Sequence, residues 1–295
     1  MMKLTKFKRS AFTMLEVVFV ILILGIVASL GAEIIARVYS SYILQRAQYR
    51  ASVKTELAAL EIANRLRYAI PGTVVRRQST SSPVSQAEEL SSPMNYSADS
   101  YNVLQWVAYD GDSFEALDPA SSTGRLPGWS GFCDLDASSR DTVKTPGSRL
   151  GFTDTIIQNL SKNSAGASTK SIADAVLFFP YDLTAYGIAG GAGDTISLDS
   201  NITGSGVGLV EQYKLAWTSY ALVVEGNDLY LYYNFSPAYA AADINSTSTS
   251  KSLLLKNITN FKFQGSGRTI RFKICKEEPI TADANVSACK EKAVF

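Results

Sequence analysis

The sequence contains no histidine, and this absence removes several classes of enzyme at once. Ser-His-Asp and Cys-His catalytic arrangements use an imidazole as general base, and the usual zinc sites use one as a ligand. We therefore expect a protein that is not an enzyme. A membrane-anchored enzyme or sensor is the alternative, and it would need a concave site with convergent titratable groups.

Metal ligands of other kinds are also scarce. Two short acidic runs offer carboxylate oxygens of the type that calcium prefers: Asp110 and Asp112, with Glu115 and Asp118 after them, and Asp134 with Asp136. Neither run has the bidentate glutamate that closes an EF-hand loop. Because Asp-Gly is typical of turns, we favour solvated turns over a calcium site, and no other cofactor is indicated.

Positive charge is missing from Ser10 to Ala36, whereas Lys3, Lys6, Lys8 and Arg9 precede this stretch. The 20 residues from Phe12 to Gly31 are almost entirely apolar and long enough to span a bilayer as a helix. The basic residues before them favour a cytoplasmic N-terminus, with the rest of the chain exported. Glu16 is the exception, because an ionised side chain in a membrane span costs about 3 kcal/mol unless it has a partner.

The N-terminal residues resemble the class III signal of type IV prepilins and type II secretion pseudopilins. The resemblance rests on the basic leader, the small residue Ala11 and the Phe-Thr-x-Leu-Glu pattern from Phe12 to Glu16. It implies that a prepilin peptidase cuts between Ala11 and Phe12 and methylates the new amine of Phe12. Ala11 departs from the glycine that is commoner in the family. The implied partners are this peptidase, the inner membrane and other major and minor pseudopilins or pilins.

Glu16 has a physical role that fits this resemblance. After cleavage, the ammonium of Phe12 is a charge at the edge of the membrane, and Glu16 of an adjacent subunit would neutralise it during assembly. The alternative is a plain signal anchor, in which the Glu16 carboxylate reaches the headgroups.

Helical periodicity continues beyond the membrane segment. Apolar residues recur at three- and four-residue steps, namely Val53, Leu57, Leu60, Ala63, Leu66 and Ile70. We expect this face to pack on a folded domain and Pro71-Gly72 to end the helix, so that a helix from Phe12 to Ala69 would be about 87 Å long. The predicted organisation is a leader at 1–11, a transmembrane and fibre-core helix at 12–31, an amphipathic helix at 32–70 and a periplasmic domain at 71–295.

From Thr73 onwards the apolar residues recur with the period of two that is typical of strands. The predicted strands are 102–109, 173–179, 213–224, 229–235, 253–264 and 268–275. Turns at 225–228 and 265–267 predict two hairpins, and Ile270, Phe272 and Ile274 should share one face of the last strand. The predicted fold class is α+β, with a long N-terminal helix packed on a mainly antiparallel sheet.

The segments 78–100, 118–149 and 184–208 are polar and rich in Ser, Thr and Gly, and we expect long loops there. Such bulk suits a subunit used once near a fibre tip better than a major pilin packed in many copies. The run Ser252–Phe263, with its glycine turn and final strand, also resembles the C-terminal part of J-type minor pseudopilins and W-type minor pilins.

An exported domain folds where disulfides form, and the chain has three cysteines. Cys275 and Cys289 flank a 13-residue polar insert, so we predict that they pair, which leaves Cys133 as a buried thiol. Three Asn-x-Ser/Thr sequences, at Asn201, Asn245 and Asn285, have an aspartate two residues upstream. This extended pattern resembles the acceptor of bacterial N-glycosylation, with polar surface loops as the alternative.

The leading hypothesis is a minor pseudopilin or pilin, a structural component of a type II secretion, type IV pilus or competence fibre, at or near its tip. It would sit in the inner membrane with its C-terminal domain in the periplasm. The alternative is an adhesin or DNA-capture tip protein on the same stalk, with secreted cargo or DNA as partner. The basic pair Arg76-Arg77 is a candidate contact for DNA, although we expect it to lie on an ordinary exposed strand face.

Overall fold

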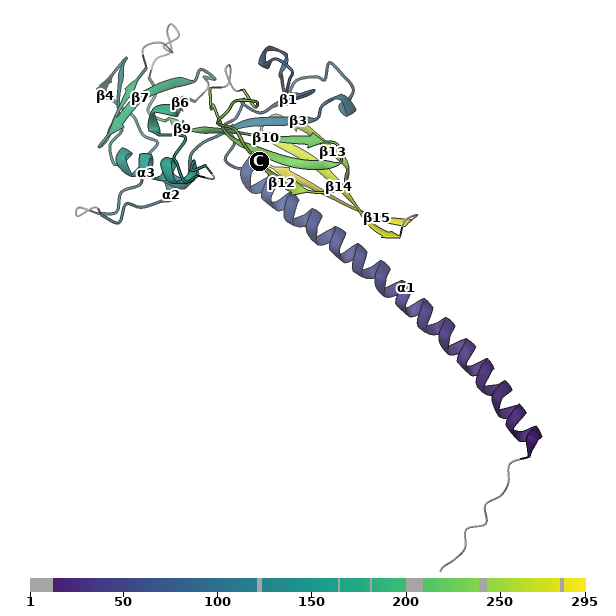
Figure 1. Ribbon diagram of the computed structural model, residues 1–295. Coiled ribbons are helices and arrows are strands. Elements are labelled where there is room, and N and C mark those ends of the chain that lie inside the picture. The colour runs from purple at the N-terminus through teal and green to yellow at the C-terminus, as the bar shows by residue number, and fades with distance from the viewer. Residues whose placement is uncertain are drawn as a thin grey trace, which may run out of the picture. The chain divides into compact units, whose positions relative to one another are not determined.

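The computed structural model describes residues 13–120, 124–163, 165–180, 182–199, 209–238, 243–281 and 284–295. A 53-residue helix, α1 (Met14–Leu66), is followed by antiparallel sheets, and its second half packs against them (Figure 1). The predicted α+β fold class is therefore confirmed. The chain divides into two compact units, Met1–Arg50 with Glu278–Val286 and Ala51–Glu277 with Ser287–Phe295.

Helix α1 ends at Leu66, three residues before the predicted end at Ala69. The backbone beyond it pairs with the end of β3 (Val103–Ala108): Tyr109 N donates to Tyr68 O at 2.9 Å, and Ile70 N donates to Val107 O at 2.8 Å. Because Tyr68 O and Ile70 N make these hydrogen bonds, they do not form the hydrogen bonds of a continuing helix. Pairing with β3 therefore ends the helix before Pro71-Gly72 is reached.

The first sheet packs on the second half of α1, and the pairings that the structure describes in it are antiparallel. Its strands run in the order β12-β11-β10-β3-β1-β2. Apart from β3, these strands are β1 (Val75–Arg77), β2 (Glu88–Glu89), β10 (Thr218–Glu225), β11 (Asp228–Phe235) and β12 (Ser250–Leu255). The predicted hairpin is present as β10 and β11, with Glu225 opposite Asp228. The segment 78–100 contains β2 and two short 3-10 helices, η1 (Val84–Gln86) and η2 (Ala98–Ser100).

The C-terminal sheet has the order β13-β14-β15, with β13 (Ile258–Ser266), β14 (Thr269–Thr281) and β15 (Ala284–Val294). Ile270, Phe272 and Ile274 are buried on one face of β14, as predicted. The single strand predicted over 253–264 is instead two strands in different sheets. The chain turns between them at Asn257, whose φ of 56° lies in the left-handed region that asparagine tolerates.

Helix α1 meets the sheets mainly through small residues, and only half of the predicted face is buried. Ala51, Ala58 and Ala59 are buried, with Ile62 and Leu66 beside them. Three members of the predicted face, Ala63, Leu66 and Ile70, are buried. The other three are exposed: Val53 (37%), Leu57 (61%) and Leu60 (42%). Alanine lets the helix backbone approach the sheet closely, and this selects the alanine stripe for the interface.

The regions predicted as long loops at 118–149 and 184–208 instead contain strands of another sheet. Its order is β4-β5-β8-β7-β6-β9, with β4 (Asp134–Ser139), β5 (Thr142–Lys144), β6 (Val176–Phe178), β7 (Tyr186–Ala192), β8 (Thr195–Leu198) and β9 (Lys214–Ala216). Three helical segments accompany it, α2 (Gly111–Glu115), α3 (Leu150–Leu160) and the 3-10 helix η3 (Ile172–Asp174) (Figure 1).

Strand β7 was predicted as part of a loop because it is rich in glycine. A Cβ on Gly191 would lie 2.9 Å from Ile172 Cδ1, the end of a flexible side chain, so glycine at this position lets η3 pack closely on the strand. The core of this region is built from apolar residues of separate segments, including Trp129, Leu150 and Leu215.

Candidate functional site

Glu16 lies in the first turn of α1, where its backbone N donates to Thr13 O at 3.0 Å. Its side chain is exposed, as are those of its apolar neighbours. The predicted cleavage site, Ala11 and Phe12, lies outside the described residues. Within the described part of the chain, α1 is the helix that is long and apolar enough to cross a membrane, a property shared by single membrane spans and signal sequences.

Among the residues that the structure describes, the large apolar side chains from Met14 to Ile35 of α1 are exposed. Exposure reaches 77% at Leu15, 63% at Phe19 and 71% at Ile35. An apolar surface of this extent needs a lipid or protein environment. It thus provides a continuous surface for insertion or association.

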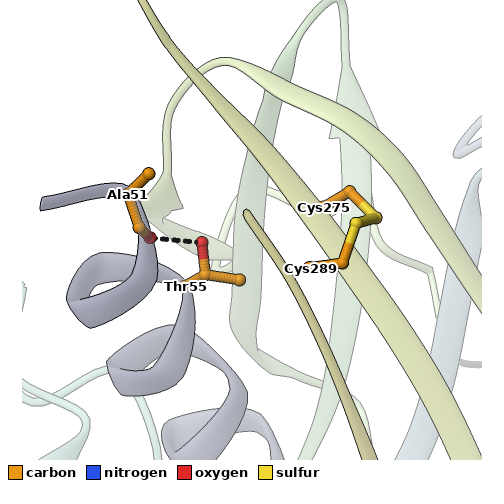
Figure 2. The surroundings of a disulfide bond; sticks show 4 residues. All are labelled: Ala51, Thr55, Cys275 and Cys289. Atoms are coloured by element: carbon orange, nitrogen blue, oxygen red, sulfur yellow. Dashed lines mark hydrogen bonds between the residues drawn. A yellow bond between two sulfur atoms is a disulfide. The ribbon is translucent and has the colours of Figure 1, made fainter. Parts of the chain in front are cut away.

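Cys275 and Cys289 form a disulfide that joins β14 to β15. Figure 2 shows the bond close to the turn of α1 that carries Ala51 and Thr55, and Thr55 Oγ1 donates to Ala51 O at 2.7 Å. Both helix residues are fully buried. Cys133 is a buried free thiol, as predicted.

Strand β15 is also held to α1 by charge. Glu56 forms ion pairs with Lys290 and Lys292, two residues that lie on one face of the strand. A hydrogen bond from the Lys292 ammonium lowers the pKa of the Glu56 carboxyl below its ordinary value. The disulfide thus links β15 to β14, and the ion pairs link β15 to α1.

The glycosylation candidates fall in different settings. Asn201 lies outside the described residues, and Asn285 is exposed in β15. Asn245 is exposed; its backbone N donates to Asp243 Oδ1 at 2.9 Å, and its Nδ2 donates to Thr80 O at 3.0 Å. The aspartate two residues upstream of Asn245 therefore has a structural role in an Asx turn.

Arg76 and Arg77 are buried, which corrects the prediction that they lie on an exposed strand face. Arg76 pairs with Glu88 at 2.9 Å and stacks on the ring of Tyr101. Arg77 donates to Gln105 Oε1 at 3.0 Å. A guanidinium can be buried in this way when carboxylates, amides and aromatic faces surround it, so neither charge is presented to a DNA backbone.

In the described ranges, no group of three His, Cys, Asp or Glu residues is close enough to hold a metal ion. Asp134 is the first residue of β4, and its Oδ1 accepts from the backbone N of Asp136 at 3.1 Å and of Ala137 at 3.2 Å. Asp112 belongs to the short helix α2, and Asp110 is the N-cap of that helix.

Asp110 is unusual for an acidic residue because it is only 4% exposed. Its Oδ1 accepts from Ser113 N at 3.1 Å, and the side chains of Ser113 and Trp217 also favour the charged form of the carboxyl. Burial raises the pKa of Asp110 from 3.8 to about 6, and neighbouring hydrogen bonds offset only part of this rise. The sequence predicted the turn at Asp110 but gave no sign of its burial.

We expect Asp110→Asn to stabilise the protein at neutral pH. Because the folded-state pKa is raised, the folded chain holds a proton that the unfolded chain releases between about pH 4 and pH 6. The stabilising contribution of that proton is complete below about pH 4 and is lost as the pH rises through about 6. A shift of this size corresponds to about 3 kcal/mol at most in the free energy of unfolding.

Urea unfolding at two pH values tests this expectation. The variant should be more stable than the wild type by up to about 3 kcal/mol at pH 7.5 and about equal to it near pH 4. Asp136→Asn removes a carboxylate from an exposed position in β4 and is the matched control. An equal difference at both pH values would mean that Asp110 is not a buried acid with a raised pKa.

No protein-family model, curated protein or solved structure matches the chain. The pilin-like features are therefore those of the chain itself: the long apolar N-terminal helix, the antiparallel sheets packed on its second half and the C-terminal disulfide.

Proposed function

We propose that this chain is a non-enzymatic structural subunit, a minor pseudopilin or pilin of a type II secretion, type IV pilus or competence fibre, located at or near the fibre tip. The observation that carries the proposal is Glu16, a single acid in the first turn of a helix whose neighbouring side chains are apolar and uncovered. A carboxylate in this position is unfavourable in lipid unless a positive charge meets it.

The proposed mechanism starts from the trimmed N-terminus. Cleavage after Ala11 would place a methylated ammonium on Phe12, four residues before Glu16. In the membrane, Glu16 of one subunit attracts the Phe12 ammonium of its neighbour, and each charge relieves the desolvation cost of the other. The exposed apolar side chains of α1 would then move from lipid into a fibre core made of such helices.

The disulfide-linked β-domain supports an exported location, since disulfides persist in oxidising compartments such as the periplasm. Within the proposed fibre, this domain would contact neighbouring minor subunits or cargo. The alternative of a DNA-capture tip protein gains nothing from Arg76 and Arg77, because both guanidinium groups are buried.

The direct test is to co-express the full chain with a prepilin peptidase and determine the N-terminus of the membrane-extracted product by intact mass and N-terminal sequencing. We expect a product that begins at methylated Phe12. A catalytically inactive peptidase provides the control and should leave the leader attached. A product that still begins at Met1 or Met2 beside the active peptidase would contradict the proposal.

A further inference from the structure

Strand β12 forms an edge of the first sheet. It stands at the end of the order β12-β11-β10-β3-β1-β2, and within the described part of the chain β11 is the strand that pairs with it. In an antiparallel pair, alternate residues direct their backbone N–H and C=O groups away from the partner strand. The outer side of β12 therefore presents backbone donors and acceptors that a further strand can use.

The other edges of the described sheets are protected in ways that natural sheets commonly use, namely very short strands and charged side chains. Strand β2 has two residues and β9 has three. Longer edge strands have a charged residue among their central positions: Asp136 in β4, Lys262 in β13 and Lys290 in β15.

The second half of β12 has no such protection. The charged residue of this strand, Lys251, lies near its start and pairs with Glu225 of the same sheet at 3.1 Å. The residues that follow include the uncharged run Leu253–Leu255. An open edge with consecutive leucines favours the addition of another strand.

An apolar groove lies beside this edge, within the second compact unit. A cavity of about 470 Å³ is lined by Leu57 and Ala58 of α1 and by Leu253–Leu255 of β12. A second cavity, of about 380 Å³, continues the first, because Glu61 and Leu254 line both. The α1 residues in the two linings extend over about 17 Å of the helix. This is the length of an extended segment of about five residues.

Apolar side chains on both walls of the groove are uncovered. Leu57 of α1 is 61% exposed and Leu253 of β12 is 40% exposed. Leu57 belongs to the face of α1 that its spacing predicts to be buried, yet no described part of the chain covers it. Exposed apolar residues on a helix and on the neighbouring sheet edge thus share one groove, which is typical of an interaction site.

Positive charge lies at the end of the groove that β12 reaches last. Lys54 and Lys276 line the first cavity together with Lys256, and Glu61, the acid in this lining, pairs with Arg65 at 2.8 Å. Lys256 is exposed and forms no ion pair among the described residues. A carboxylate of a partner would therefore be attracted to this end of the groove.

We propose that β12 and this groove bind an extended apolar segment of another protein, which adds to the first sheet as a further strand and places a carboxylate near Lys256. An extended backbone can pair with the open edge of β12, whereas a helix or a small apolar molecule would leave these groups unpaired. A second copy of the chain fits less well, because β12 contains a lysine and no carboxylate. Because β12 lies in the β-domain, this binding does not require the proposed fibre function.

The test uses the full chain in detergent micelles and the blocked peptide acetyl-Glu-Ile-Thr-Val-Thr-Val-amide. Main-chain hydrogen bonds supply the affinity when a strand is added, so the probe does not have to be the natural partner. Isothermal titration calorimetry gives the dissociation constant. We expect saturable binding, and hydrogen exchange over Ser250–Leu255 should slow when the peptide is bound.

Two control peptides test for strand pairing. Each has N-methyl groups on alternate backbone amides, one on the Ile and Val residues and the other on the Thr residues. Alternate amides of a strand face opposite sides, so the set that faces β12 should bind roughly tenfold more weakly once methylated. The other peptide should bind nearly as the parent does.

Three variants locate the site. Leu253→Lys places a charge on the open edge and should weaken binding roughly tenfold. Leu135→Lys changes a leucine of similar exposure in the edge strand β4 and should bind as the wild type does. Lys256→Glu should reverse the charge preference, so that a peptide with Lys in place of its Glu binds more tightly than the parent peptide.

Four results would overturn the proposal: no saturable binding, equal effects of the two N-methylated peptides, equal affinity of Leu253→Lys and the wild type, or a Lys256→Glu variant that still prefers the acidic peptide. Sedimentation equilibrium without peptide tests for self-pairing. A dimer that Leu253→Lys dissociates would show that a second copy occupies the edge, which also contradicts the proposal. Each of these results leaves the cleavage of the leader before Phe12 to be decided by its own test.

Discussion

Glu16→Ala should be cleaved and methylated like the wild type but should enter the fibre at least tenfold less well. The variant keeps Ala11 and Phe12 of the proposed cleavage signal, so we expect the peptidase step to be unchanged. Assembly differs, because the Phe12 ammonium of the neighbour would meet no carboxylate at the edge of the hydrocarbon. A cost of about 3 kcal/mol for an uncompensated charge corresponds to roughly a hundredfold in an equilibrium. Immunoblots of sheared fibres against total membrane protein from the native host measure the ratio.

Two further variants separate charge from other effects. Glu16→Gln keeps the shape and polarity of the side chain, so a defect close to that of Glu16→Ala identifies the charge as the cause. Glu33→Ala removes a second acid from the same exposed region of α1, where Glu33 pairs with Arg37 on its own helix. This control should assemble normally. Normal incorporation of Glu16→Ala, or an equal defect in Glu33→Ala, would show that the ammonium–carboxylate pairing is wrong.

The sequence predicts correctly the elements that neighbouring residues determine, such as a helix set by its spacing or a hairpin set by its turn. Helix α1 follows from a long apolar run and helical spacing, and the hairpin of β13 and β14 follows from a glycine turn between alternating residues. The disulfide was predictable because two cysteines flank one polar insert. This insert is not a loop, however, since β14 continues to Thr281 and β15 begins at Ala284.

The buried face of α1 shows where local reasoning ends. Two stripes on this helix have the three- and four-residue spacing that predicts a buried face, one of alanines such as Ala51 and Ala58 and one of larger residues such as Val53 and Leu57. Hydrophobicity favours the larger stripe, but the alanine stripe is the one that packs on the sheets. The choice depends on how closely the helix backbone approaches the strands, and the strands come from distant parts of the chain.

Asp110 shows the same limit at the candidate site. The sequence predicts its turn, because Asp-Gly follows an apolar strand. Its carboxyl group interacts with the side chain of Trp217, which lies more than one hundred residues further along the chain. A buried carboxylate with a raised pKa is therefore a property of the assembled fold. The nearest sequence signal was the dense group of aromatic residues in the strands that turn out to surround it.

Removing the disulfide with Cys275→Ser and Cys289→Ser should lower the free energy of unfolding of the β-domain by about 3 kcal/mol. The bond closes a loop with 13 residues between the cysteines, and restricting a loop of about this length in the unfolded chain contributes roughly that much. For a domain of about 200 residues this corresponds to a fall of roughly 6–12 °C in the melting temperature. Thermal melts of the oxidised wild type and the double variant measure it.

The loss should be concentrated in β15. This strand lies at the end of the order β13-β14-β15, and beyond its pairing with β14 it is held to α1 by the ion pairs of Glu56 with Lys290 and Lys292. Hydrogen exchange should therefore rise most over Ala284–Val294 in the double variant, whereas exchange in β10 should change little. A thiol titration provides the control: the denatured wild type should show one free thiol, Cys133, before reduction and three after it. Three thiols before reduction, or unchanged exchange in β15, would show that the bond does not hold this strand in place.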